Sequence, residues 1–403
     1  MSEFDGNNPV CKAPFTSIRY SANGFIMPCC WMTHVNFMRA DVTTVEKYWN
    51  SNYVKNIRRE MLQGKLPDKC GRCKKVGDAT GYQRIKFFER VVKDADIFYR
   101  EDQPFKVLQM DFNFSNRCNL KCRHCGGWNS SSWLKDEKKL TEMIPDLKRG
   151  TYEAFIPTPE MINAKDNFKN IKRLDFKGGE PLMQKEMYQL LENLVEWDFA
   201  KNIDLYYITN GTKDHKEVKP LWKHFKKIHL SISFEGTGSL FSYIRGGDTI
   251  DWEQFKTNFH EFTKLENLNN LTFAHTIVNY AMYDLPNQIK FMIDTYKKYN
   301  IESNFYTYDN LQLRNVVTNP PYLDPIILPK EMKIELIEIY KKSNYKCLYP
   351  IINSLQSTLD HYDDKNWNFF IKYTDALDKI RNQSLIDVVP QFKKYISRNL
   401  HKI

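Results

Sequence analysis

The sequence predicts a mixed α/β protein built on a partial (β/α)6 barrel. Between residues 104 and 310, short apolar runs alternate with stretches of helical periodicity, which is the pattern of βαβ units and a parallel sheet. Polar side chains recur at every second position in several of these runs, whereas a closed eight-stranded barrel fills its interior with branched apolar residues. We therefore expect an open barrel whose inner face is polar and able to hold a ligand.

Six runs are predicted as strands, namely 106–114, 171–177, 203–209, 227–234, 271–278 and 302–308, with connecting helices at 185–199, 251–266 and 286–299. In the first strand Gln109, Asp111 and Asn113 fall on one face, while Leu108, Met110, Phe112 and Phe114 fall on the other. The polar alternation continues at Arg173, Asp175 and Lys177, and again at His229, Ser231 and Ser233. Solvent-exposed strands are the alternative, which helices covering a parallel sheet make less favourable.

Composition places few limits on function but suggests a compartment. The chain of 403 residues has no apolar run of about 18 residues, and its first residues are too acidic and polar for a signal peptide. Nine cysteines, an odd number, are grouped as metal ligands rather than as a disulfide framework, so we expect a reducing, cytoplasmic location. The net charge of +10 permits a nucleic-acid partner, but mixed-sign charge favours a solvated surface.

Cys118, Cys122 and Cys125 are the most informative group, because their spacing is suited to one iron-sulfur cluster. Four thiolates normally close a cubane cluster, so three leave one iron open to a substrate or cofactor. On spacing alone, a zinc site completed by His124 or a distant residue is the alternative.

The segment 116–126 resembles the radical S-adenosylmethionine (SAM) family, although His124 stands where the family usually has another aromatic residue. The resemblance implies that Cys118, Cys122 and Cys125 bind a [4Fe-4S] cluster whose open iron takes the amino and carboxylate groups of SAM. It further implies that one electron cleaves SAM to a 5′-deoxyadenosyl radical, which abstracts hydrogen from the substrate.

The resemblance extends to the turns that follow the predicted strands. The segment 177–181 is similar to the family's Gly-Gly-Glu-Pro turn, which implies that backbone atoms of Gly178, Gly179 and Glu180 contact the amino group of SAM. By the same resemblance we expect further cofactor contacts from Asn210, Ser231, Ser233 and Arg245, with Arg245 pairing with the methionine carboxylate. Ordinary solvated loop positions are the alternative for these side chains.

The amino-terminal segment holds four more candidate metal ligands, Cys11, Cys29, Cys70 and Cys73. It is similar to the auxiliary-cluster modules called SPASM and twitch, which implies a second [4Fe-4S] cluster, although those modules usually follow the barrel. Cys29 and Cys30 compete for one ligand position, and the order Pro-Cys favours Cys29. A zinc ribbon is the alternative.

We therefore divide the chain into a twitch-like module at 1–103, a radical SAM core at 104–310 and a helical carboxyl-terminal cap at 311–403. The resemblance implies an oxidoreductase-like or peptide-modifying radical SAM enzyme, with SAM and a reducing donor such as flavodoxin or ferredoxin as partners. Its substrate, a peptide or protein side chain or a small molecule, and its catalytic residues stay open. The alternative from another class is a zinc-binding interaction protein with a basic, nucleic-acid-binding surface.

Overall fold

The computed structural model describes residues 9–32, 38–71, 73, 85–93, 95–147, 155–213, 216–246, 249–301, 311, 313, 315–360 and 363–396. The chain divides into two compact units. The first comprises Met1–Asn116, Tyr152–Tyr207 and Lys216–His229, and the second comprises Arg117–Thr151, Ile208–His215 and Leu230–Ile403. Within the described residues, no helix is both long and apolar enough to cross a membrane.

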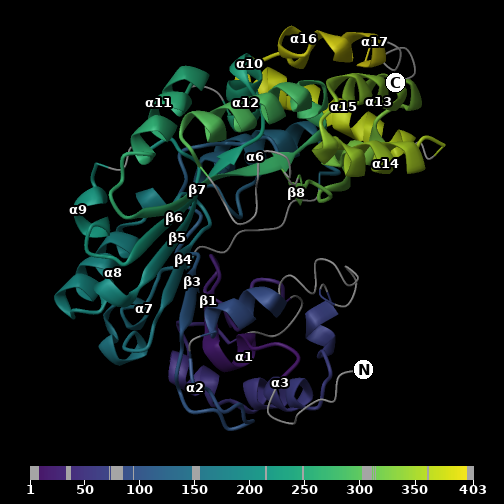
Figure 1. Ribbon diagram of the computed structural model, residues 1–403. Helices are drawn as coiled ribbons and strands as arrows, with labels where there is room; N and C mark the ends of the chain where they lie inside the picture. The colour runs from purple at the N-terminus through teal and green to yellow at the C-terminus, as the bar shows by residue number, and fades with distance from the viewer. Residues whose placement is uncertain are drawn as a thin grey trace. The chain divides into compact units, whose positions relative to one another are not determined.

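Eight strands form a sheet in the order β2-β1-β3-β4-β5-β6-β7-β8 (Figure 1). Their bounds are β1 Ser17–Tyr20, β2 Ile26–Met27, β3 Gln109–Phe112, β4 Arg173–Phe176, β5 Asp204–Thr209, β6 Lys227–Phe234, β7 Leu268–Ile277 and β8 Asn315–Val316. Strand β1 is antiparallel to β2, whereas the β1/β3, β3/β4, β4/β5 and β7/β8 pairs are parallel. The predicted mixed α/β class with a largely parallel sheet is confirmed.

The first unit carries α1 Ala13–Thr16, α2 Val45–Trp49, α3 Asn52–Leu62, α7 Glu160–Asn163, α8 Lys185–Glu196 and α9 Lys219–Trp222. Its short 3-10 helices are η1 Asp68–Cys70, η3 Lys165–Asn167, η4 Pro181–Met183 and η5 Ala200–Asn202. Helix α3 begins where Ser51 Oγ accepts a hydrogen bond from Val54 N, and its apolar spacing buries Val54, Ile57 and Met61.

The second unit is mostly helical. It contains α6 Leu134–Met143, α10 Gly238–Arg245, α11 Trp252–Phe262, α12 Leu285–Lys298, α13 Lys330–Ser343, α14 Tyr349–Ser357, α15 Asp364–Arg381, α16 Leu385–Val388 and α17 Lys393–Ile396. Short 3-10 helices are η2 Ser131–Trp133, η6 Asn279–Asp284, η7 Pro321–Leu323, η8 Pro325–Ile327, η9 Lys346–Leu348 and η10 Pro390–Phe392. The predicted helical carboxyl-terminal region is confirmed.

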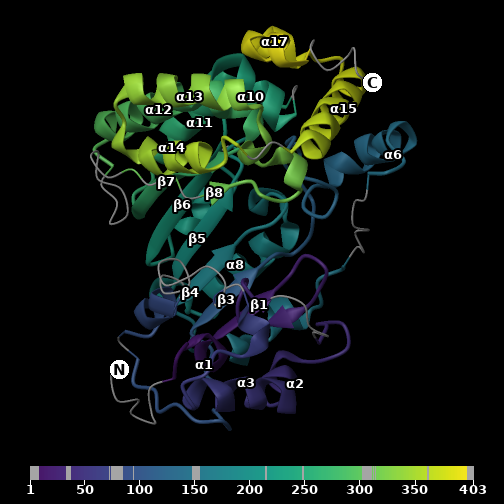
Figure 2. The ribbon, with the colours of Figure 1, turned by 90° about the vertical axis from the view of Figure 1, so that its right-hand side faces the viewer.

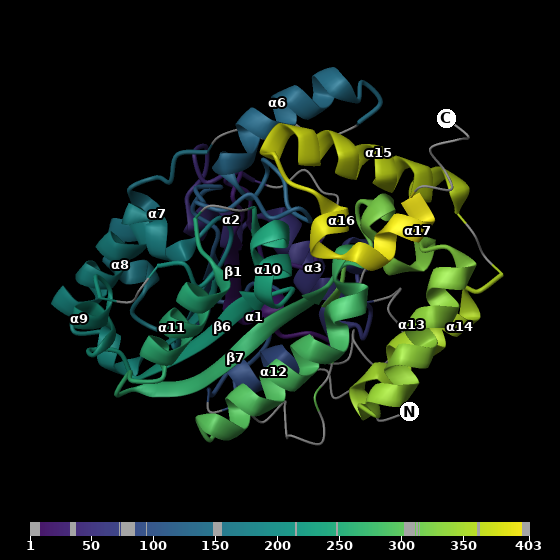
Figure 3. The ribbon, with the colours of Figure 1, turned by 90° about the horizontal axis from the view of Figure 1, so that it is seen from above.

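Helix α6 packs against α15, although more than 200 residues separate them in the chain. Figures 2 and 3 show these two helices side by side. This contact joins the segment after the three-cysteine loop to the carboxyl-terminal helices.

An aromatic row crosses four strands of the first unit. Tyr20, Phe112, Phe176 and Tyr207 are register partners along β1, β3, β4 and β5, and neighbouring rings stack 5.0 to 5.9 Å apart between centroids. Helix α8 reaches this row through Met187, whose sulfur accepts a hydrogen bond of 3.4 Å from Tyr207 Oη. Because side chains alternate along a strand, the adjacent row faces the opposite side of the sheet.

The sheet differs from expectation at both ends. Five predicted strands correspond to β3 through β7, while the predicted strand 302–308 lies outside the described residues. The sheet also includes β1 and β2, a hairpin from the segment predicted as a separate module, because Ile18 and Tyr20 bury their side chains as β1 pairs with β3. The boundaries at 103 and 310 stay predictions.

Candidate active site

The three-cysteine loop lies in the second unit, after β3. All three thiols are partly exposed. Cys118 Sγ accepts hydrogen bonds from Leu120 N at 3.5 Å and from Asn210 Nδ2 at 3.7 Å. Hydrogen bonds to sulfur of this kind tune iron-sulfur clusters, so the chemistry of this donor set fits three thiolate ligands.

The same loop is also held through its main-chain carbonyl groups, which accept hydrogen bonds from side chains. Trp133 Nε1 donates to Cys122 O at 2.9 Å, and Ser132 Oγ donates to Cys118 O at 2.7 Å. Gly246, at φ +93°, ends α10 against the loop, where an added Cβ would lie 2.8 Å from Lys121 O. The loop is therefore fixed through carbonyl groups and through a close approach that only glycine permits.

Asn210 ties the turn after β5 to the three-cysteine loop. Its Nδ2 donates to Asn119 Oδ1 at 2.9 Å, and its Oδ1 accepts from Thr212 N at 2.9 Å. Asn119 Nδ2 in turn donates to Thr212 Oγ1 at 2.8 Å. Asn210 thus positions the segment between Cys118 and Cys122, while its predicted contact with SAM stays a prediction.

Arg245 makes a buried ion pair. Its Nη1 lies 2.7 Å from Glu235 Oε2, its Nη2 donates to Asn210 O at 2.7 Å, and both charged side chains are 3% exposed or less. Glu235 Oε1 also lies 3.6 Å from His124 Nε2. The guanidinium therefore orients the Asn210 turn; its predicted pairing with the methionine carboxylate remains untested.

The sequence reasoning missed Glu235, although a signal for it existed. His229, Ser231 and Ser233 are polar at every second position, and the next position in this alternation is Glu235. Arg245 and His124 meet at this carboxylate, so Glu235 links α10 to the three-cysteine loop.

Desolvation is the largest electrostatic effect on two side chains of this loop, Cys122 and His124. It raises the pKa of Cys122 well above that of an ordinary thiol, with the Arg245 charge pulling in the opposite direction. Burial also lowers the pKa of His124, against the opposing effect of Glu235. A thiol whose pKa is raised is protonated when no metal is bound, so a metal that binds Cys122 would displace its proton.

Of the two serines on β6, Ser231 lies beside a separate cavity. Ser231 Oγ lies 3.1 Å from Thr272 Oγ1, and both side chains line a cavity of about 190 Å³ together with His275, Tyr296 and Asn315. Ser233 is half-buried two residues further along β6. Ser231 therefore faces a space that can admit a small polar group, and neither serine's contact with SAM is tested.

In the first unit, the predicted glycine turn has the conformation that glycine allows. Gly178 and Gly179 have φ values of +73° and +54°. A Cβ on Gly178 would lie 1.7 Å from Asn113 Oδ1, so another residue would be strained at this positive φ and would have to displace the Asn113 side chain. The fully buried Glu180 accepts a hydrogen bond from Leu182 N at 3.1 Å and so caps η4. Its carboxylate has a structural role, which leaves its backbone for the predicted contact.

The four amino-terminal cysteines line one cavity in the first unit. Cys11, Cys29, Cys70 and Cys73 share its walls with apolar side chains including Ala13, Met32, Met61, Leu66 and Ile85. Cys29 Sγ accepts a hydrogen bond of 3.4 Å from Trp31 N. Of the two adjacent cysteines, Cys29 lines this cavity and Cys30 does not, which supports the choice of Cys29. The donor set fits a cluster with four thiolate ligands.

In neither group of cysteines are the side chains arranged to coordinate a metal ion. Among the residues that the structure describes, no three His, Cys, Asp or Glu side chains are close enough together to hold a metal ion. The assignments of Cys11, Cys29, Cys70 and Cys73 and of Cys118, Cys122 and Cys125 as metal ligands therefore stay predictions.

A charged row crosses the first unit on the face opposite the aromatic row. We define the charged row as Arg19, Asp111, Asp175 and Tyr206, which are register partners on β1, β3, β4 and β5, together with the flanking Gln109, Arg173 and Lys177. The predicted polar face of the first two core strands is thus present, joined by a side chain from β1.

Ion pairs connect the charged row. Asp111 Oδ2 lies 2.9 Å from Arg19 Nη1 and 2.8 Å from Lys177 Nζ, and Asp175 Oδ1 lies 2.7 Å from Arg173 Nη2. Burial alone would raise the pKa of Asp175, but Arg173 and Lys177 outweigh it and hold the pKa below its usual range. Asp175 therefore stays ionised at neutral pH, and three cationic side chains surround the two carboxylates.

Acceptor atoms on this row are available to a ligand. Within the described residues, Asp111 Oδ1 and Gln109 Oε1 are buried without a hydrogen-bond donor. Next to the row, His229 stacks on Tyr206 at 3.9 Å between centroids, and its buried Nε2 also has no described partner. Buried polar atoms are normally satisfied, so these atoms favour a ligand that brings hydrogen-bond donors.

Residues 112–280 match the model of the Radical SAM superfamily. The chain is 29% identical over 178 residues to an S-adenosylmethionine-dependent nucleotide dehydratase of Fibrobacter sp. (strain UWH6), covering 43% of this chain and 48% of that protein. It is 23% identical over 286 residues to a GTP 3′,8-cyclase of Staphylococcus haemolyticus (strain JCSC1435), covering 64% and 73%. The chain thus spans about half the length of the first relative and more of the second.

Among solved structures, native anSMEcpe with bound AdoMet is similar with a TM-score of 0.36 and 16% identity, over 58% of this chain and 60% of that chain. SuiB of Streptococcus suis bound to S-adenosylmethionine has a TM-score of 0.33 and 14% identity, over 65% and 49%.

Proposed function

We propose that this chain, which carries a radical SAM domain over residues 112–280, is an enzyme that cleaves SAM reductively and takes hydrogen from a polar small molecule. The observation that carries the proposal is the three-cysteine loop, where N–H groups of Leu120 and Asn210 already donate to Cys118 sulfur. Three thiolates leave one iron for a ligand, which is the arrangement SAM chemistry needs.

In this proposal Cys118, Cys122 and Cys125 hold a [4Fe-4S] cluster, which supplies the electron for cleaving the SAM sulfonium bond. Hydrogen bonds that the Trp133 and Ser132 side chains donate to carbonyl oxygens of the loop hold the loop in place. Gly178 and Gly179 contribute backbone in a left-handed conformation, which lets a ligand approach without a Cβ in its way.

Cys11, Cys29, Cys70 and Cys73 hold a second cluster in the proposal. The support is that all four line one cavity with otherwise apolar walls. Four thiolates close a cluster, and apolar surroundings keep water from it, so this cluster serves electron transfer or the fold rather than SAM binding.

The charged row supports a substrate that carries hydroxyl or amino groups. Asp111 Oδ1 and Gln109 Oε1 need hydrogen-bond donors, while Arg19, Lys177 and Arg173 tolerate an anionic substituent. Two relatives are named for reactions of nucleotides. A nucleotide combines ribose hydroxyls with phosphate, so it is the substrate class to test first, with a reducing donor such as flavodoxin or ferredoxin in the cytoplasm.

The test is 5′-deoxyadenosine formation from SAM by the full chain, reconstituted with iron and sulfide without oxygen and reduced chemically. We expect product from the natural sequence and none from a variant with Cys118, Cys122 and Cys125 changed to Ala. A variant with only Cys347 changed to Ala controls for thiol loss and should retain cleavage. Equal product from the triple variant, or zinc without iron in the purified chain, would reject the proposal.

A further inference from the structure

Arg123 lies inside the three-cysteine loop, directly after Cys122, and its side chain is fully buried. Its guanidinium carbon lies 3.6 Å from the centre of the Tyr243 ring, and its Nε donates to Tyr243 O at 3.0 Å. A full charge at such a position needs a compensating partner, because burying it alone costs several kcal/mol.

The compensating partners come from the carboxyl-terminal region, about 250 residues away. Arg123 Nη2 donates to Asp378 Oδ1 and, at 2.9 Å, to Gln383 Oε1. Tyr373 Oη donates to Arg123 O at 3.3 Å. Side chains of α15 and of the turn after it therefore bond both the main chain and the side chain of one loop residue.

A second attachment lies beside the first. Asp136 on α6 is 3.2 Å from Lys121 Nζ in the loop and 2.9 Å from Arg381 Nε at the end of α15. The Arg381 guanidinium also lies 4.4 Å from the centre of the Trp133 ring, and Trp133 donates to Cys122 O. The packing of α6 on α15 in Figures 2 and 3 thus reaches the loop on both sides of Cys122.

We propose that α15 is a positioning element for the three-cysteine loop, and that the Asp378 carboxylate sets the charge at its cluster by compensating Arg123. The inference rests on the proposed function, since it requires a cluster on this loop. Without the carboxylate, the charge of Arg123, the residue that follows Cys122 in the loop, loses its anionic partner. A nearby positive charge favours the reduced cluster and makes its midpoint potential more positive.

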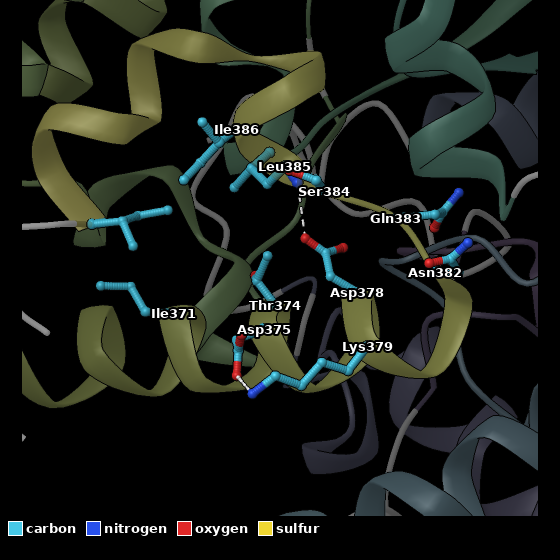
Figure 4. Close-up of a pocket in the computed structure, with 11 residues that line it drawn as sticks. Ile371, Thr374, Asp375, Asp378, Lys379, Asn382, Gln383, Ser384, Leu385 and Ile386 are labelled. Carbon is cyan, nitrogen blue, oxygen red and sulfur yellow. Dashed lines mark hydrogen bonds and ion pairs between the residues drawn. The ribbon is translucent and has the colours of Figure 1, made fainter.

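Asp378 can be changed without leaving a void. It lies on the wall of a cavity of about 390 Å³ on α15, with Asp375, Lys379 and Ser384 nearby (Figure 4). Asp378 Oδ1 also accepts from Tyr243 Oη at 3.0 Å, and Oδ2 accepts from Leu385 N at 2.8 Å. Asparagine keeps the shape but only one acceptor oxygen, so Asp378→Asn removes the charge together with one of these acceptors.

Asp375 provides the matched control. It lies on the same helix and the same cavity, but its carboxylate pairs with the exposed Lys379 at 2.7 Å (Figure 4). Asp375→Asn therefore removes the same charge from α15 without touching the Arg123 contact.

The experiment compares the full chain with Asp378→Asn, Asp375→Asn, Arg123→Gln and the Arg123→Gln/Asp378→Asn double variant. We would measure two quantities in each variant. One is the iron content, and the other is the midpoint potential of the electron paramagnetic resonance signal that changes when SAM is added. We expect Asp378→Asn to shift the potential positively, Arg123→Gln negatively, the double variant to return toward the natural value, and Asp375→Asn to leave it unchanged. Displacement of the loop should slow SAM cleavage by Asp378→Asn roughly tenfold to a hundredfold.

Shifts of the same sign in Asp378→Asn and Arg123→Gln, or equal effects of Asp378→Asn and Asp375→Asn, overturn the inference and leave the proposed function standing. No SAM-responsive signal in the natural chain overturns the proposed function itself. If Asp378→Asn does not fold, Gln383→Ala replaces it. That variant should keep its iron and potential but cleave SAM more slowly, and natural cleavage in it counts against the inference.

Discussion

The two cysteine groups of this chain are held by different forces. The three-cysteine loop is surrounded by buried charges and hydrogen bonds, with the Arg245–Glu235 and Arg123–Asp378 pairs on elements distant in sequence. Three of the amino-terminal cysteines, Cys11, Cys29 and Cys70, belong to an apolar cluster with Phe15, Ile57, Met61 and Phe88. One group depends on polar contacts from afar, and the other on local hydrophobic packing.

The spacing of the cysteines in the sequence explains why the two groups are held in place differently. Three candidate ligands within eight residues lie on one loop, whose position is set by contacts with groups outside it. The candidate ligands Cys11, Cys29, Cys70 and Cys73 are brought together on the walls of one cavity by the apolar burial of their segment. The polar group suits a cluster that receives a charged ligand, and the apolar group suits one that is closed.

The largest effect should separate Cys29 from Cys30. Cys29→Ala removes a thiol from the wall of the four-cysteine cavity, so we expect the reconstituted chain to lose about half of its iron. Cys30→Ala is the matched control and should keep its iron. Iron and sulfide analysis measures both, and equal iron in the two variants would show that the four-cysteine group is wrongly chosen.

The next effect tests the polar support of the three-cysteine loop. Glu235→Ala leaves Arg245 buried without its carboxylate, which should lower the free energy of unfolding by about 3 to 5 kcal/mol. Glu253→Ala breaks an exposed pair with Lys256 and should cost at most about 1 kcal/mol. Urea unfolding compares them, and a similar loss in both would mean that the buried pair does not hold this region.

A smaller effect is expected at the charged row of the first unit. Asp111→Asn removes a buried carboxylate acceptor, so a nucleotide should bind about tenfold more weakly. The rise in melting temperature caused by added GTP measures this, with the exposed Asp198→Asn as control. An equal rise in Asp111→Asn and the natural chain would remove the charged row from the substrate site.

The last effect appears only at acidic pH. Burial, with Arg173 and Lys227 adding to it, lowers the pKa of His229 to about 4, below its ordinary value near 6.5. The unfolded chain therefore binds a proton that the folded chain does not between these values, and stability falls as pH drops from about 6.5 to 4. His229→Phe keeps the stack on Tyr206 and should flatten that fall. An unchanged slope in thermal unfolding would contradict it.

Sequence reasoning found the elements whose signals are local. The alternation of polar and apolar residues predicted β3, β4 and β6 to within a few residues of their bounds. The helical spacing of apolar residues predicted α8, α11 and α12. Helix α8 ends earlier than expected, at Glu196, because Asp198 adopts φ +61°. Strand β1 was missed as part of the sheet, since its four residues, Ser17 to Tyr20, are too short a run for their alternation to stand out.

By itself, the sequence determined the ligand types, their spacing and the polar face of the strands, because each depends on neighbours a few residues apart. Only the tertiary structure decided that Cys29 rather than Cys30 joins the four-cysteine cavity, that Glu235 pairs with Arg245, and that Asp378 meets Arg123. These are contacts between residues far apart in the chain. In the two ion pairs, charge attraction and hydrogen bonds offset the cost of burying the charges, and no local pattern records which residues meet.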